Sequence, residues 1–220
     1  MRGVTRMKFL AMLVGFAAAA WASAADASVI LRLSDYTPET SVPASWLDAL
    51  MTFTVSDNTL TLDVKNLTPD PEVSPPHSFR INDLHFNVSD NVTDMTLVAP
   101  PEGWALTFSR DDLLVGGLGY FDVRVKGGQG GNDRNQIFPG ETTTFTIAFT
   151  GTGVTESDFT TEKSVGQMES RAAAKFIPVG VGTSAEGATF TTVTVVPEPA
   201  TLALMAGGLT VAMVLRRRRR

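Results

Sequence analysis

The chain has 220 residues, of which 23 are acidic and 18 basic, and it contains no cysteine. The absence of cysteine excludes disulfides, thiolate metal sites and a cysteine nucleophile, so packing alone must stabilise the fold. The formal net charge of −5 hides an uneven distribution, because residues 28–196 hold 21 acidic and 10 basic side chains, a net of −11. A body this acidic repels phosphate backbones, which argues against nucleic-acid binding and favours solubility outside the cell.

The first 27 residues have the three parts of a secretory signal peptide. Basic residues at positions 2, 6 and 8 precede the apolar run from Phe9 to Ala20, and two Ala-x-Ala sequences follow. Cleavage after Ala24 or after Ala27 would fit, and Ala27 is favoured because a strand pattern begins at Ser28. A membrane-anchoring first helix is the alternative, but twelve residues rise only ~18 Å in a hydrocarbon core of ~30 Å. We therefore expect an exported protein.

Residues 28–196 alternate between apolar and polar side chains with the period of β-strands. One apolar set (Met51, Phe53 and Val55) and a second (Leu60, Leu62 and Val64) flank Asp57-Asn58, which predicts a two-residue hairpin. The same phase recurs in the segments 29–33, 84–88, 104–108, 121–125, 145–149, 177–181 and 190–196. Eight or nine strands with almost no helical periodicity predict an all-β body, a single antiparallel β-sandwich that is Ig-like or jelly-roll-like.

Two stretches of the body depart from this pattern, and neither divides it into separate domains. Residues 69–77 carry four prolines, which predict an extended surface loop. Ser170 to Lys175 contains three consecutive alanines, which predict a short helix.

The last residues, 197–220, form a third unit. Pro197-Glu198-Pro199 precedes an apolar run, 200–215, and five arginines, Arg216, Arg217, Arg218, Arg219 and Arg220, end the chain. The apolar run predicts a transmembrane helix of ~24 Å, and the arginines fix its end on the cytoplasmic side as a stop-transfer cluster. A permanent single-pass anchor and a basic nucleic-acid arm are the alternatives, and the second fits poorly because the arginines directly follow an apolar helix.

This tail resembles the PEP-CTERM sorting signal of bacterial exported proteins. The resemblance implies recognition by an exosortase, a membrane-embedded cysteine transpeptidase that processes the tail near the Pro-Glu-Pro motif. Pro197, Glu198 and Pro199 would then be substrate residues, and the helix would hold the protein in the inner membrane only transiently. The expected destination is the cell surface or the extracellular matrix.

A glycine-rich loop, 126–135, is the most suggestive segment for ligand binding. Asn132, Asp133 and Asn135 offer oxygens that a calcium ion accepts, and the glycines allow the backbone to fold tightly. The spacing differs from that of an EF-hand, and a flexible hairpin tip explains the composition equally simply. Calcium is therefore an alternative expectation, with no other cofactor implied.

Aromatic side chains offer a second kind of binding site. Trp46 and Tyr120 could stack on a polysaccharide, with Trp46 the better candidate, whereas Trp104 shares its phase with Leu106 and Phe108 and is expected in the core.

No pattern in the body predicts catalysis. The two histidines, His77 and His85, lack metal-ligand spacing, and we expect a structural or solvent-facing role for them, with His85 on the polar side of its strand. Asp111-Asp112 could serve as a glycosidase-like pair, but adjacent carboxylates are ordinary in an acidic protein. The leading hypothesis is thus a non-catalytic body, followed by a calcium- or polysaccharide-binding module and then by a carboxylate-dependent hydrolase.

Overall fold

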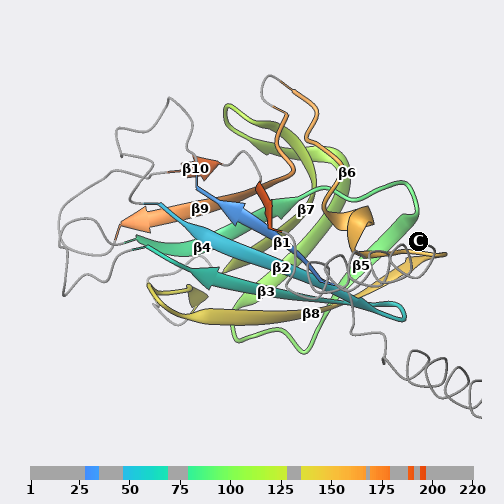
Figure 1. Ribbon diagram of the computed structural model, residues 1–220, viewed down its shortest axis with the longest axis horizontal. Coiled ribbons are helices and arrows are strands. Elements are labelled where there is room, and N and C mark those ends of the chain that lie inside the picture. Colours follow the sequence, from blue (N-terminus) through green and yellow to red (C-terminus); the bar gives the residue numbers. More distant parts are fainter. Residues whose placement is uncertain are drawn as a thin grey trace, which may run out of the picture.

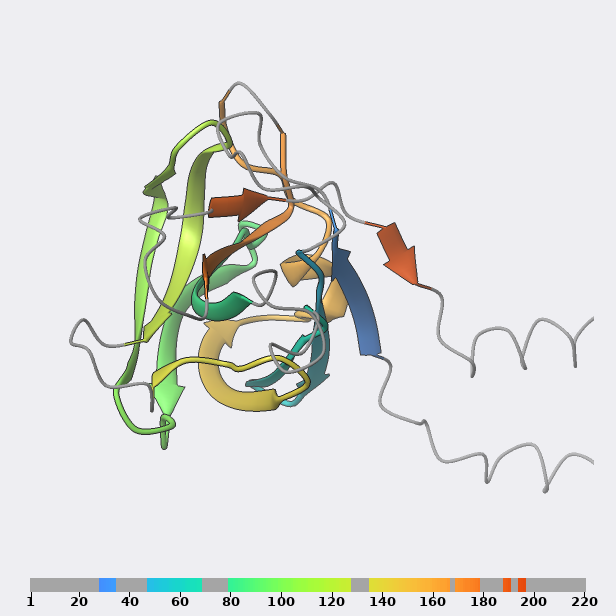
Figure 2. The same cartoon turned by 90° about the vertical axis from the view of Figure 1, so that its left-hand side faces the viewer.

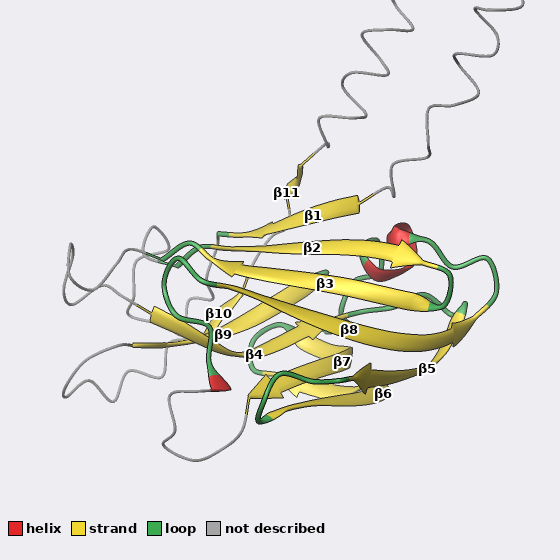
Figure 3. Ribbon diagram, turned by 90° about the horizontal axis from the view of Figure 1, so that it is seen from below, coloured by secondary structure: helices red, strands yellow, loops and turns green. Residues whose placement is uncertain are grey.

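The computed structural model describes residues 28–34, 47–68, 79–127, 135–166, 169–178, 188–190 and 194–196. These residues form two antiparallel sheets that face each other (Figures 1 and 3). The strands are β1 (Ser28–Leu33), β2 (Ala49–Ser56), β3 (Thr59–Asn66), β4 (Phe79–Phe86), β5 (Val92–Val98), β6 (Trp104–Val115), β7 (Gly119–Gly127), β8 (Thr142–Gly151), β9 (Ala172–Pro178), β10 (Ala188–Phe190) and β11 (Thr194–Val196). The signal-peptide and C-terminal helix predictions lie outside the described residues.

The six-stranded sheet has the order β11-β1-β2-β3-β8-β5, and the five-stranded sheet has the order β10-β9-β4-β7-β6. Seen from the side, the blue β1 and the yellow-green β6 and β7 lie on opposite sides of the molecule (Figure 2). The prediction of an all-β body with two antiparallel sheets is confirmed.

The predicted hairpin is confirmed as β2 and β3. Ser56 pairs with Thr59, which leaves a two-residue turn of Asp57 and Asn58. Asp57 has a φ of 53°, the left-handed conformation that a two-residue primed turn requires and that aspartate tolerates better than most residues. The sequence of this turn therefore fixes the register of the two strands.

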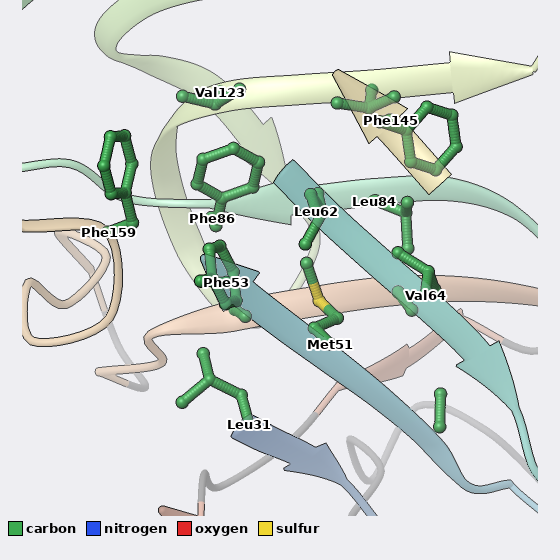
Figure 4. Packing of buried hydrophobic residues seen from close by; sticks show 14 of the residues in the cluster. Leu31, Met51, Phe53, Leu62, Val64, Leu84, Phe86, Val123, Phe145 and Phe159 are labelled. Atoms are coloured by element: carbon green, nitrogen blue, oxygen red, sulfur yellow. The ribbon is translucent and has the colours of Figure 1, made fainter. Parts of the chain in front are cut away.

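Apolar side chains from both sheets fill the space between them (Figure 4). Phe53 of β2 meets Phe86 of β4 edge to face, with ring centroids 5.5 Å apart. Trp104 is buried as predicted, and its ring lies 5.0 Å from that of Phe145 on β8. Each of these aromatic pairs joins the two sheets, so the core depends on the inward positions of both.

The predicted helix from Ser170 to Lys175 is wrong, because β9 begins at Ala172. Ala172, Ala173 and Ala174 are fully buried, and their backbone pairs with β4 on one side, while β10 pairs along the other. Alanine favours a helix by less than about 1 kcal/mol per residue, and two strand partners outweigh that preference.

Strand β5 was not predicted from the sequence. Its buried side chains, Val92 and Met95, are three residues apart, because the register shifts between Val92 and Asp94 in the pairing with β8. Such a bulge breaks the period of two on which the prediction depends.

Replacing Phe53 with alanine should destabilise the protein by about 3–5 kcal/mol, because the change opens a cavity between the sheets. Urea unfolding of the purified protein measures this. The control is Val98→Ala on β5, a half-exposed position where we expect a change within about 0.5 kcal/mol. Equal effects of the two substitutions would contradict the described core.

Candidate functional site

Strand β4 separates apolar and polar side chains onto its two faces. Leu84 and Phe86 belong to the core between the sheets, so Asp83 and His85, which alternate with them, lie on the outer face of the five-stranded sheet. Both polar side chains are nevertheless buried. Buried ionisable groups are costly unless they are paired, so the partners of this pair are informative.

Basic side chains surround Asp83 on this outer face. Asp83 is aligned with Lys175 on β9 and with Lys126 on β7, and His85 is aligned with Arg124 on β7. Aligned residues on neighbouring antiparallel strands point to the same face of a sheet. The strand pairing therefore gathers four side chains that can carry positive charge around one carboxylate.

Asp83 accepts hydrogen bonds from Arg124 through both carboxylate oxygens. The Nε of Arg124 lies 2.9 Å from Oδ1, and its Nη2 donates to Oδ2. The Nε2 of His85 lies 3.3 Å from Oδ1. Burial alone would raise the pKa of Asp83, but the hydrogen bonds from His85 and Arg124 outweigh it and hold this pKa below its ordinary value. Asp83 is therefore an anchored, ionised carboxylate.

His85 is less exposed than its place on a polar strand face suggests. Its side chain is 7% exposed, and its ring lies 5.7 Å from that of Phe121. Phe121 belongs to a second, smaller apolar cluster with Val115, Leu118 and Ala173. Of the structural and solvent-facing roles expected for His85, its burial fits the structural one, because this cluster covers the outer face beside it.

The imidazole also has one nitrogen without a partner. Its Nδ1 is buried and makes no hydrogen bond in the described part of the chain.

A hollow of 240 Å³ opens beside the charged cluster. Its lining consists of Asp83, His85, Arg124 and Lys175, together with Leu114, Val115 and Gly116 from the end of β6 and the turn after it. The hollow thus combines fixed charges on one side with apolar side chains of Leu114 and Val115 on the other.

A second hollow of 200 Å³ gathers several acidic side chains around Arg110. Asp122 is the buried one, and its two oxygens accept hydrogen bonds from the backbone nitrogens of Val88 and Asp111, at 3.0 and 2.8 Å. Asp90 lies 3.6 Å from Arg110. These contacts give the carboxylates a structural role, fixing the backbone where the pairing of β6 with β7 becomes irregular.

The proposed catalytic pair lies at this irregularity. Asp111 and Asp112 are both exposed, and Asp112 accepts a hydrogen bond from the hydroxyl of Ser109 at 3.2 Å. Buried Asp158 accepts hydrogen bonds from Ser89, Asn91 and Thr155, and although burial raises its pKa, these hydrogen bonds outweigh burial and hold the pKa below its ordinary value. The downward shifts at Asp83 and Asp158 are opposite to what a glycosidase general acid needs.

The calcium prediction is only partly within the described residues, because Asn132 and Asp133 fall outside them. Asn135 packs closely over two glycines: a Cβ added at Gly103 or Gly127 would lie 2.0 Å from one of its atoms. Over the described ranges, no group of three or more histidine, aspartate or glutamate side chains could hold a metal ion. Trp46 and His77 are also outside these ranges.

The two ends of the described chain meet at one edge of the six-stranded sheet. Strand β11 pairs with β1, and Val196 is aligned with Ile30 (Figure 3). No helix in the described ranges is both long and apolar enough to cross a bilayer. The sorting residues Pro197 to Pro199 and Arg216 to Arg220 follow β11 and lie outside the described ranges.

Comparison with known families assigns the tail. Residues 195–220 match the PEP-CTERM protein-sorting motif. The chain therefore carries a PEP-CTERM sorting signal. No curated protein and no solved structure matches the chain. The PEP-CTERM match implies an exported protein that an exosortase processes, and it covers none of the outer-face cluster.

Replacing Asp83 with asparagine should lower the stability of the PEP-CTERM chain at pH 7 by about 1–3 kcal/mol, because Arg124 and His85 lose a charged acceptor. The pKa of Asp83 is lower in the folded protein than its ordinary 3.8, so its contribution to stability is complete well above pH 3.8 and is lost as the pH falls through the folded-state pKa. The difference between wild type and Asp83→Asn should therefore shrink on acidification, as measured by urea unfolding at pH 7 and pH 3. A difference that grows on acidification would contradict this assignment.

Proposed function

We propose that this protein is an exosortase substrate whose non-catalytic β-sandwich body is exported, held briefly in the inner membrane and delivered to the cell surface or extracellular matrix. The match of residues 195–220 to the PEP-CTERM motif carries this proposal. In it, Pro197, Glu198 and Pro199 form the processing motif, and residues 200–215 span the membrane until the tail is processed.

The pairing of the terminal strands supports this route. Strand β1 begins at Ser28, directly after the favoured signal-peptide cut, and β11 ends at Val196, directly before Pro197. Because Val196 is aligned with Ile30, the two processing junctions leave the body at the same edge. A folded body can then remain attached to one membrane through either end without any strand having to separate.

The strand order of the body supports the Ig-like alternative of the predicted sandwich. The chain changes sheets after β3, β4, β5, β7, β8 and β10. The order β2-β3-β8-β5 follows the A-B-E-D order of an Ig domain, and β10-β9-β4 follows its G-F-C order, with the β6-β7 hairpin added beside β4. The pairing of Asp83, Asp122 and Asp158 with donors supports a non-catalytic role for the body.

The processing motif can be tested directly by replacing Glu198 with glutamine. In cells with an active exosortase, we expect the wild-type chain to lose its C-terminal tail and the Glu198→Gln chain to retain it in the membrane fraction. Intact-mass analysis of secreted and membrane fractions reads both outcomes. Asp112→Asn in the body is the control and should be processed as wild type. A wild-type tail that stays uncut would overturn the proposed function.

A further inference from the structure

The outer face of the five-stranded sheet carries a concentration of positive charge that the whole body lacks. Four of the ten basic side chains of residues 28–196 lie at outward positions of β4, β7 and β9, namely Arg80, Arg124, Lys126 and Lys175. The body as a whole has a net charge of −11. A local reversal of sign at a hollow attracts a ligand of the opposite charge.

Asp83 offsets only part of this charge. It is the only carboxylate among the described residues that line the 240 Å³ hollow, and Arg124 already neutralises it through paired hydrogen bonds. Lys175 lines the same hollow, and Lys126 flanks Asp83 on the other side. Among the described residues that line the hollow, two basic side chains, Arg124 and Lys175, thus accompany one carboxylate.

An exposed apolar row adjoins the charged hollow. Leu114, in the wall of the hollow, is aligned with Tyr120, which forms an isolated bridge with Val165. The three residues are 64%, 41% and 56% exposed, respectively. Large apolar side chains that gather at the surface mark binding sites more often than scattered ones do.

Basic groups, hydrogen-bonding groups and the exposed apolar row thus lie within one small area. We propose that this face binds an acidic saccharide, with the carboxylate of a hexuronate ring against Arg124 and Lys175. The ring hydroxyls lie near Asp83 and His85, and the apolar face of a sugar ring contacts Leu114 and Tyr120. A neutral sugar leaves the charges unused, and a free phosphate leaves the apolar row uncovered.

This proposal does not depend on the processing of the tail. It is tested by isothermal titration of the exported protein with three probes: trigalacturonate, neutral maltotriose and inorganic phosphate. We expect binding of trigalacturonate alone, weakened by added salt because the attraction is electrostatic. Equal binding of phosphate would show that the site selects only for negative charge and would contradict the proposal. Equal binding of maltotriose would show that the positive charges play no part in binding. No binding of trigalacturonate would contradict the proposed site.

Matched double variants locate the interaction. Lys126→Gln with Lys175→Gln should weaken trigalacturonate binding about tenfold or more, because charge-assisted hydrogen bonds are lost. Lys65→Gln with Lys163→Gln removes the same charge elsewhere on the body, at exposed positions, and should change the affinity less than about twofold.

The contribution of the apolar row is tested with Leu114→Ser, which should weaken the affinity for trigalacturonate several-fold while circular dichroism shows an unchanged fold. Equal effects of the two double variants, or no effect of Leu114→Ser, would overturn the proposed site.

Discussion

The inward face of each strand has to be apolar, because a chain without cysteine has only the contact between its two sheets to hold the body together. Phe53 against Phe86 and Trp104 against Phe145 show how this contact is made, each pair taking one ring from each sheet. The alternation that points these rings inward also points their neighbours outward. The outer faces are consequently free to carry charges, and the charged cluster of β4 is a direct result of the same geometry.

The stability that this cluster gives the fold is a small difference between opposing terms. Removing charges from water costs several kcal/mol per ion, and well-packed apolar residues often serve a fold as well as a buried ion pair does. Asp83, which is 4% exposed, needs Arg124 and the nearby His85 to remain ionised. The arrangement contributes to stability while Asp83 is ionised, and it also holds Arg124 in place at the wall of the hollow.

The sequence predicted the features that depend on neighbouring residues. The Asp57-Asn58 turn, the burial of Trp104 and the Pro-Glu-Pro tail are all local, and all agree with the structure or the family match. Features that depend on distant residues were missed. Ala172 to Ala174 form a strand only because β4 and β10 flank them, and Arg124 reaches Asp83 across 41 positions of sequence. Knowledge of the strand register would have been needed to find either.

The ends of the protein direct its export and processing, and we propose that the outer face of its five-stranded sheet binds an acidic saccharide. Backbone amide shifts of the isotopically labelled exported protein, followed during titration with trigalacturonate, test it most directly. We expect shifts at His85, Arg124 and Lys175 and unchanged amides along β3, in the opposite sheet. Shifts confined to β3 or β5, or spread evenly over both sheets, would contradict it.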